Sequence, residues 1–352
     1  MKRIITAAIM LVLSLVLFTA CASKGPEKET GAEGTPENSG QEGSVGEANE
    51  EAPTEAAQPA GEAGASEEAM QGLTYPYTYV DAAGREVVLE QEPARIAVNY
   101  LPLWETLLML DVMPIAASGA QNYIATWDAF AGYELSSIQD IGTSEVNLEL
   151  LTELQPDIIL DQAFDVSNLD IVHLEKIASV AVFGNDTKMD WRLSLREVAR
   201  IVNKEAKAEE VIAEVDAKLA LARKKLEENY SGDTVMQISM MGEDKYYCTY
   251  RPDLYDDSMG LGLNLPEGYT TALTYEQISM EAIVEMNPDY IFMNVFDGDE
   301  ALFEALQENT VWKSLKAVRN GHVYRLDGGG HACSPLATVY TVNFITDAML
   351  GE

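Results

Sequence analysis

Two similar stretches of thirteen residues occur in this chain of 352 residues, and they restrict the fold more than any other feature. Residues 147–159 read NLELLTELQPDII, and residues 279–291 read SMEAIVEMNPDYI. In both copies a glutamate stands seven residues before a Pro-Asp pair, and most apolar positions between them align. Each copy predicts a short helix that leads into a buried strand. A repeat of this kind indicates two similar structural units.

A long helical segment separates the two copies. Residues 204–229 place apolar side chains on one face and charged side chains on the others. At 1.5 Å per residue, this helix is a rod of roughly 39 Å. It is either an ordinary surface helix or a strut between two lobes, and the repeat favours the strut. Strands and helices alternate on both sides of it, which is typical of parallel sheets flanked by helices.

We therefore predict an α/β fold with two Rossmann-like lobes, each with a parallel sheet, joined by a single long α-helix. The expected N-terminal lobe is residues 73–188, the helical segment 189–230 and the C-terminal lobe 231–352. The expected strands are 75–80, 85–89, 96–99, 114–118, 158–160, 180–183, 235–240, 290–294 and 322–326. The expected helices are 103–110, 148–154, 171–178, 190–203, 204–229, part of 275–284, 302–306, 312–318 and 338–349. Residues 121–127 are expected to form a loop.

The N-terminus indicates export from the cytoplasm. Lys2 and Arg3 precede a run of apolar and small residues that ends in Leu17-Phe18-Thr19-Ala20-Cys21, as in a secretory signal. This ending resembles a bacterial lipobox, which implies that residues 1–20 are removed and that the Cys21 thiol carries the lipid. The alternatives are a plain membrane anchor, because the run is nearly long enough to span a bilayer, or a signal peptide with an incidental cysteine.

The next segment, residues 21–72, predicts a disordered acidic tether. Between residues 22 and 72 there are twelve glutamates, two lysines and no aromatic residue. Such a composition cannot bury enough apolar surface to offset the entropy of ordering the chain. The tether is either a spacer above the membrane or a solvated filler of no specific length.

Charge and motif content exclude several functions. The formal net charge is −35, whereas nucleic-acid binding needs a positive field. A neutral or cationic ligand is easier to accommodate than an anion. No nucleophile elbow, no two-histidine zinc spacing and no Cys-x-x-Cys is present, so we expect no catalysis and no resident metal or cofactor. Cys248 and Cys333 either pair or pack as small buried residues.

Beyond residue 72, the chain resembles the periplasmic-binding domain family that serves importers of iron–siderophore complexes, haem and vitamin B12. The resemblance covers nearly all of residues 75–352. It rests on both Glu-x6-Pro-Asp units, the helical rod and residues 81–87, 93–96, 105–110 and 312–324, in this order and spacing. It implies a ligand cleft between two lobes whose hinge motion is small. It also implies that Glu149 and Glu281 lie on the top surfaces of the lobes and pair with arginines of a membrane permease. Otherwise they are ordinary solvated glutamates.

The ligand site is expected where parallel strands end, because ligands of open α/β sheets bind beyond the carboxyl ends of the strands. Loops at these ends are rich in aromatic residues, which suits a bulky, partly apolar chelate. Arg251 is a candidate anchor for a ligand oxygen, or else a turn residue before Pro252. His331, after three glycines, is either a ligand of haem iron or a hydrogen-bond donor. The candidates are Tyr100, Tyr123, Trp127, Asp161, Phe164, Met241, Tyr246, Tyr247, Tyr250, Arg251, Phe296 and His331.

Together with this resemblance, the observations predict an extracytoplasmic lipoprotein that binds a small molecule; the resemblance implies that it delivers this molecule to the permease dimer of an ABC importer. The expected ligand is an iron–siderophore complex. A strongly anionic catecholate complex is disfavoured because no basic pocket is evident, although Arg251, Lys245 and Arg325 could still build one. Haem or a corrinoid such as cobalamin is the alternative ligand. An enzyme that processes metal chelates on the same fold, and a sensing or adhesion lipoprotein, are alternatives of other classes.

Overall fold

The structure is a computed structural model that describes residues 72–143, 145–162 and 171–351. The predicted signal peptide, Cys21, the tether up to residue 71 and Phe164 lie outside the described residues. The described chain contains two five-stranded sheets and a separate two-stranded hairpin.

The first sheet is parallel throughout, as predicted. Its strands lie in the order β5-β4-β3-β6-β7. The antiparallel hairpin of β1 and β2 precedes it in the chain. The bounds are Tyr77–Val80 (β1), Glu86–Leu89 (β2), Ile96–Val98 (β3), Ala116–Ala117 (β4), Gln139–Asp140 (β5), Ile158–Gln162 (β6) and Ser179–Phe183 (β7).

The second sheet repeats this arrangement with one change. Its order is β10-β9-β8-β11-β12, and β8, β11 and β12 are parallel to one another. Strands β9 and β10 run antiparallel to their neighbours, because β8 turns directly into β9. That turn uses two residues with positive φ, Gly242 at 109° and Asp244 at 53°. The bounds are Val235–Met240 (β8), Tyr246–Cys248 (β9), Glu276–Ile278 (β10), Tyr290–Val295 (β11) and Val323–Leu326 (β12).

Most predicted helices are present within a few residues of their expected ends. The helices of the described residues, of which α3, α6 and α9 were not predicted, are α2 (Leu101–Met109), α3 (Ala120–Thr126), α4 (Leu148–Leu154), α5 (Ile171–Leu174), α6 (Asn185–Met189), α7 (Trp191–Val202), α8 (Glu205–Tyr230), α9 (Pro252–Tyr255), α10 (Met280–Met286), α11 (Glu300–Glu308), α12 (Lys316–Asn320) and α13 (Pro335–Leu350), with 3-10 turns η1 (Asp128–Phe130), η3 (Trp312–Ser314) and η4 (Gly328–Gly330). The prediction of a loop at 121–127 was wrong. Helix α3 forms there after Gly119, whose φ of 66° and close contact with the Tyr123 ring suit only glycine.

The two sequence repeats form the same structure. Helices α4 and α10 both have seven residues, and each begins at a side-chain cap. Asn147 accepts from the Leu150 N–H at 3.0 Å, and Ser279 accepts from the Ala282 N–H at 3.3 Å. Each helix ends at a residue with left-handed backbone, and a buried strand follows after the Pro-Asp pair.

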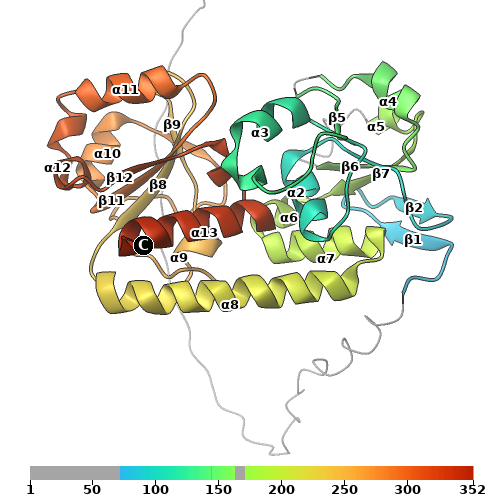
Figure 1. The fold of residues 1–352 in the computed structure, drawn as a ribbon, viewed down its shortest axis with the longest axis horizontal. Coiled ribbons are helices and arrows are strands. Elements are labelled where there is room, and N and C mark those ends of the chain that lie inside the picture. Colours follow the sequence, from blue (N-terminus) through green and yellow to red (C-terminus); the bar gives the residue numbers. More distant parts are fainter. Residues whose placement is uncertain (1–71, 144, 163–170, 352) are drawn as a thin grey trace, which may run out of the picture. The chain divides into compact units, whose positions relative to one another are not determined.

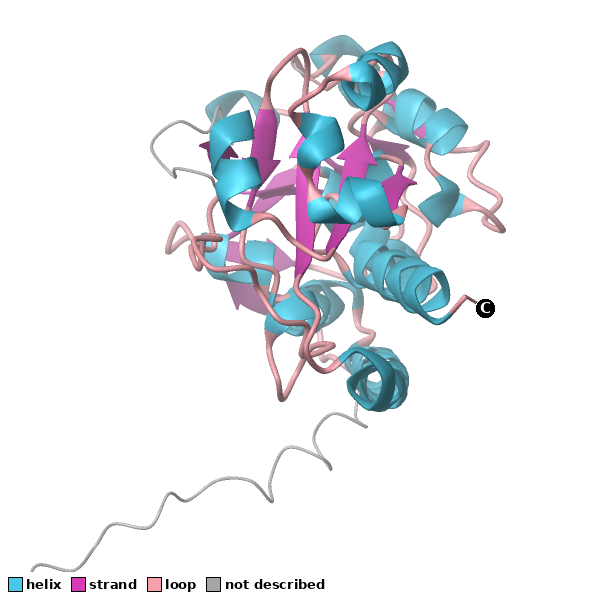
Figure 2. Cartoon of the chain, turned by 90° about the vertical axis from the view of Figure 1, so that its left-hand side faces the viewer, coloured by secondary structure: helices cyan, strands magenta, loops and turns pink. Residues whose placement is uncertain are grey.

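Helix α8 leads from the first lobe to the second, as predicted for the strut. Its 26 residues bury the predicted apolar face, and it contacts α7 and α13 along its length (Figure 1). Helix α13 also contacts α2 of the first lobe. The apolar core is continuous through these helices, from Ile96 and Leu160 in one sheet to Val235 and Phe292 in the other. Figure 2 shows helices in front of and beside the strands of the second lobe.

Candidate ligand-binding site

A cavity of about 500 Å³ lies between the two lobes. Most of its wall comes from the first lobe, where β3, β4, β5 and β6 end or the segments after them begin. This is the edge at which open α/β sheets bind ligands. The lining residues are Asn99, Tyr100, Leu101, Pro102, Ser118, Tyr123, Thr143, Val146, Asp161, Gln162, Lys188 and Met189 from the first lobe, and Tyr275, His331, Ala332 and Cys333 from the second.

Hydrogen bonds hold the polar wall of the first lobe in place. The Asn99 amide donates to Asp161 Oδ2 at 3.2 Å, and the Gln162 amide donates to the carbonyl oxygen of Phe183 at 3.2 Å. Asp161 and Gln162 are almost fully buried at the end of β6. These side chains are therefore fixed before any ligand arrives.

The second lobe contributes an aromatic wall. The rings of Tyr275 and His331 stack with their centroids 4.3 Å apart. The rings of Phe296 and His331 pack edge to face with their centroids 5.2 Å apart. The Tyr275 hydroxyl donates to the His331 carbonyl oxygen at 2.6 Å. Lys188 of the first lobe lies over the Tyr275 ring, 5.7 Å from its centroid. This pair connects the two walls.

Burial controls the protonation of the groups around the cavity. Burial raises the pKa of Asp161, while hydrogen bonds from the Gln162 N–H and the Asn99 amide act in the opposite direction and lower it. It lowers the pKa of Lys188 and raises the pKa of Cys333 to about 12. Burial, together with the charges of Arg251 and Lys188, lowers the pKa of His331 to about 3, so this ring is neutral at neutral pH. Among the described lining residues, the formal charges are one lysine and one aspartate.

Helix α2, whose first residues line the cavity, also carries a buried carboxyl group. Glu105 of α2 is fully buried, and neither carboxyl oxygen has a hydrogen-bond partner among the described residues. Burial raises its pKa to about 8, while Ser334 and the charge of Arg251 act in the opposite direction. Glu105 also raises the pKa of the cavity residues Tyr100 and Tyr123, although burial is the larger cause at both.

Four of the predicted ligand residues, Tyr100, Tyr123, Asp161 and His331, come together in this cavity. Trp127 and Phe296 lie behind it and form a contact between the lobes, with ring centroids 6.3 Å apart. Trp127 is 5% exposed and also packs against Gly328. These two rings therefore support the cavity, while Phe164 lies outside the described residues.

The tyrosines of β9 and the segment after it do not line the cavity. Tyr246 is 2% exposed and packs into the core, since β9 is a strand rather than a loop. Tyr247 borders only a recess of about 10 Å³ that it shares with His331. Tyr250 packs on Tyr255, with centroids 5.9 Å apart. Met241, also predicted, is exposed outside the cavity.

Arg251 does not line the cavity either, which corrects its assignment as a ligand anchor. It is 1% exposed, and its guanidinium forms a two-pronged ion pair with the Asp253 carboxylate, at 2.8 and 2.5 Å. Its Nη1 donates to the Gly330 carbonyl oxygen at 2.9 Å. The sequence did not show that Asp253, two residues away, would neutralise this charge inside the protein.

The sequence analysis missed other lining residues, above all Lys188 and Tyr275. Lys188 and Met189 lie in α6, which follows the carboxyl end of β7. Ligands of open α/β sheets bind beyond such strand ends, so the segment after β7 is a place where lining residues can be expected from the sequence. Tyr275 lies just before β10 in a segment that was expected to contain a helix. No pattern in the sequence placed it near His331.

The two glutamates of the repeat, Glu149 and Glu281, lie at equivalent places. Each is exposed in the first turn of its helix, α4 or α10, one in each lobe.

The structure decides between the two alternatives for Cys248 and Cys333. Both thiols are free and buried, so these residues pack in the interior and do not form a disulfide.

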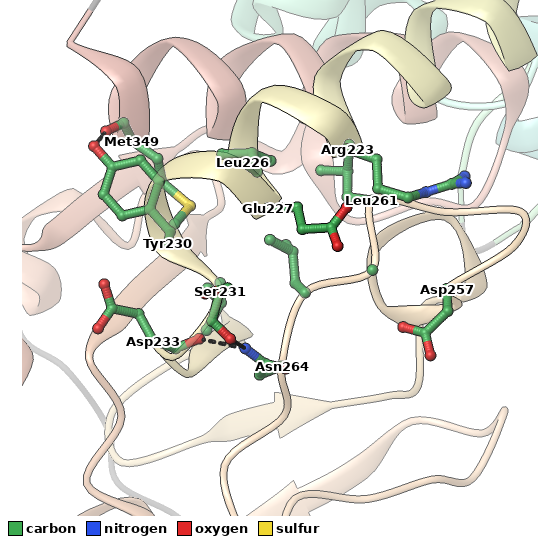
Figure 3. Close-up of a pocket in the computed structure, with 13 residues that line it drawn as sticks. Arg223, Leu226, Glu227, Tyr230, Ser231, Asp233, Asp257, Leu261, Asn264 and Met349 are labelled. Atoms are coloured by element: carbon green, nitrogen blue, oxygen red, sulfur yellow. Dashed lines mark hydrogen bonds between the residues drawn. The ribbon is translucent and has the colours of Figure 1, made fainter.

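A second cavity, of about 330 Å³, lies at the end of α8 (Figure 3). Its wall comes from α8, the segment 257–264 and the end of α13, with no described residue from the first sheet. Arg223 at its rim donates to the carbonyl oxygens of Gly260 and Ser258 at 2.6 and 3.0 Å. Figure 3 shows Asn264 held by the carbonyl oxygens of Ser231 and Asp233. These groups are occupied with their neighbours, so we consider the interlobe cavity the candidate site.

Comparison with known proteins identifies relatives of the described part. A family described as "Periplasmic binding protein" matches residues 104–328. The iron(3+)-hydroxamate-binding protein of Bacillus subtilis is 28% identical over 289 residues, covering 78% of this chain and 86% of that protein. A probable siderophore-binding lipoprotein of the same organism is 26% identical, covering 71% of this chain and 80% of the relative.

A solved structure shares the fold. The triscatecholate siderophore binding protein of Bacillus subtilis, complexed with ferri-bacillibactin, has a TM-score of 0.64 at 22% identity, covering 78% of this chain and 99% of that one. In residues 72–143, 145–162 and 171–351, no helix is long and apolar enough to cross a membrane.

Proposed function

Because this chain belongs to the periplasmic binding protein family, we propose that it is the substrate-binding protein of an ABC importer and that it captures a ferric siderophore between its lobes. The family consists of substrate-binding proteins rather than enzymes. The observation that carries the proposal is the interlobe cavity of about 500 Å³, a volume in the usual range for small-molecule sites. Its walls combine aromatic rings with a few fixed polar groups.

The charges around the cavity favour a neutral iron complex. Iron(III) bound by three hydroxamates is neutral, whereas iron(III) bound by three catecholates carries three negative charges. The described lining offers one lysine and one aspartate, and the Arg251 charge is neutralised by Asp253. A trianion would therefore lose its hydration without gaining several cationic partners. We infer a hydroxamate-type siderophore as the ligand.

The remaining parts of the proposal concern location and delivery. Cys21 would carry the lipid that holds the protein at the outer face of the cytoplasmic membrane, and the acidic tether would separate the binding domain from it. Glu149 and Glu281 would contact the two subunits of the permease, because a twofold permease suits one exposed carboxylate on each lobe. The relative named as a siderophore-binding lipoprotein supports the lipid anchor.

Calorimetric titration of the full mature chain tests the ligand assignment. The panel is a ferric trihydroxamate, a ferric tricatecholate, haem and cobalamin. We expect the trihydroxamate to bind at least about tenfold more tightly than the tricatecholate, a difference of about 1.4 kcal/mol. If haem or cobalamin binds most tightly, that compound and not a siderophore is the ligand of this site. If none of the four compounds binds, the proposed function is refuted.

A further inference from the structure

The ring of His331 is held on three sides. Its Nδ1 lies 2.9 Å from the hydroxyl oxygen of Ser239. One face stacks on Tyr275, and the rings of Phe296 and His331 pack edge to face, with their centroids 5.2 Å apart. A side chain fixed in this way presents its remaining ring nitrogen, Nε2, in a single direction. No hydrogen bond from Nε2 is formed to the described residues.

The backbone next to His331 is held as well. The carbonyl oxygen of Gly330 accepts from Arg251 Nη1 at 2.9 Å and from Gln237 Nε2 at 3.0 Å. The carbonyl oxygen of His331 itself accepts from the Tyr275 hydroxyl. The buried Arg251 therefore positions the histidine rather than contacting a ligand. This degree of fixation is typical of a preorganised binding group.

The neighbours of Ser239 determine where its proton lies. The Asn294 amide nitrogen donates to the Ser239 hydroxyl oxygen at 3.1 Å. The other amide atom, Asn294 Oδ1, is buried and faces Gly330, because a side-chain atom built on that glycine would lie 2.6 Å from it. A carbonyl oxygen tolerates a C–H neighbour, whereas an NH2 group in this position would point its hydrogens at the same C–H group. The amide orientation is therefore fixed, with its nitrogen toward Ser239.

The proton of Ser239 then has one acceptor within reach. Its oxygen accepts from Asn294, and among the described residues no acceptor other than Nδ1 of His331 lies within hydrogen-bond distance of its O–H, so the O–H donates to Nδ1. A neutral imidazole carries one proton, and if Nδ1 accepts, that proton is on Nε2. The low pKa of the ring, which burial and the charges of Arg251 and Lys188 cause, keeps it neutral.

We propose that the Asn294–Ser239 pair fixes His331 as the Nε2–H tautomer, so that this ring donates a hydrogen bond to an oxygen atom of the bound ligand and does not ligate a metal. The proposal rests on the proposed function for the ligand, but the tautomer exists in the unliganded protein. A metal-ligating histidine usually donates its other N–H to an acceptor, whereas Nδ1 of His331 faces a donor. Oxygen atoms of a metal chelate are suitable acceptors.

The tautomer can be observed directly. The chain has three histidines, so a long-range proton–nitrogen NMR spectrum of the full mature chain labelled with 15N-histidine has three ring systems. The signals lost in His331→Gln identify this ring. We expect an Nε2–H tautomer that does not titrate between pH 5 and 8. An Nδ1–H tautomer, or a ring that titrates near the ordinary histidine value, would overturn the proposal.

Binding of a ferric trihydroxamate tests the donor role. His331→Phe removes the donor, and we expect a loss of affinity of about tenfold, which is the usual size for one hydrogen bond. His331→Gln retains an amide donor at a similar position and should restore part of the affinity. Ser239→Ala frees Nδ1, so the spectrum should show both tautomers and the affinity should fall.

The outcomes separate this inference from the proposed function. If no siderophore binds, the proposed function fails, even if the ring is the Nε2–H tautomer. If a siderophore binds and His331→Phe and His331→Gln lose the same affinity, the donor role fails while the function stands. If haem binds with an iron–histidine spectrum that His331→Phe abolishes, the exclusion of metal ligation is wrong.

Discussion

Glu105 shows how a single buried group makes stability depend on pH. In the folded protein its carboxyl group has no hydrogen-bond partner among the described residues, and burial raises its pKa from 4.5 to about 8. In the unfolded chain it ionises at its ordinary value. Between pH 4.5 and about pH 8 the folded form holds one more proton than the unfolded chain. The contribution of protonated Glu105 to stability is therefore fully present below pH 4.5 and is lost as the pH rises through about 8.

Replacing Glu105 by glutamine should remove this dependence. Each unit of pKa shift corresponds to about 1.4 kcal/mol, so the variant should gain stability relative to the unmodified protein as the pH rises from 5 to 9. Urea unfolding at several pH values measures the difference. The comparison isolates Glu105, because the other titrating groups are common to both proteins. A difference between the two proteins that stays constant with pH would show that this carboxyl group is ionised when buried.

At this scale, the sequence predicts residue types better than side-chain environments. It placed Tyr100, Tyr123 and His331 at strand ends, and these residues do line the cavity. It could not show that Arg251 would turn inward to Asp253, because the pairing depends on how a buried turn packs. It could not place Tyr275 opposite His331 either, since 56 residues separate them and only tertiary packing brings them together.

At the scale of elements, the aspartates of the two Pro-Asp pairs perform the same structural task. Asp157 accepts from the backbone N–H groups of Ala94 and Arg95, at 2.9 and 2.8 Å, just before β3. Asp289 accepts from the N–H and the hydroxyl of Thr234, at 3.0 and 2.9 Å, just before β8. Each carboxylate thus joins the repeated helix–strand unit to the first strand of its sheet.

Substitution of these aspartates by alanine should destabilise both lobes, but unequally. We expect Asp289→Ala to cost about 1–3 kcal/mol, because it leaves a partly buried N–H and a hydroxyl without an acceptor. Asp157→Ala should cost less, since Asp157 is exposed and water can replace it. The free energy of unfolding in urea measures both. Asp297→Ala, at an exposed aspartate without a hydrogen bond from the described residues, is the control. Equal costs for all three would contradict this role.

Elements were predictable where periodicity or capping was strong. The rod at 204–229 and the helix at 148–154 are present almost as expected, because one has a long apolar face and the other lies between a cap and Pro-Asp. Helix α3 was missed because its seven residues are too few to show a period. Strand β9 was not among the predicted strands, because a short aromatic run suits a strand or a loop equally.

At the scale of the molecule, direct contacts between the lobes surround the cavity. The N–H of Asp128 donates to Asp327 Oδ2 at 2.7 Å, and Trp127 packs closely against Gly328. The core also continues through α8 and α13. A continuous core resists large rigid-body motion, so we expect small changes of interlobe angle on binding rather than wide closure. The proposed recognition by a permease would then depend on surfaces that both lobes present together.

The exposed glutamates of the repeat are the groups that such recognition would use. We expect Glu149→Ala with Glu281→Ala to reduce siderophore uptake by cells about tenfold or more, because each lost carboxylate leaves a permease cation unpaired. Binding by the purified protein should stay within twofold, since neither residue lines the cavity. Glu153→Ala with Glu285→Ala changes exposed glutamates on the same two helices and serves as the matched control. If the control pair lowers uptake equally, general surface charge rather than Glu149 and Glu281 governs docking. If the first pair leaves uptake intact, the contact with the permease lies elsewhere.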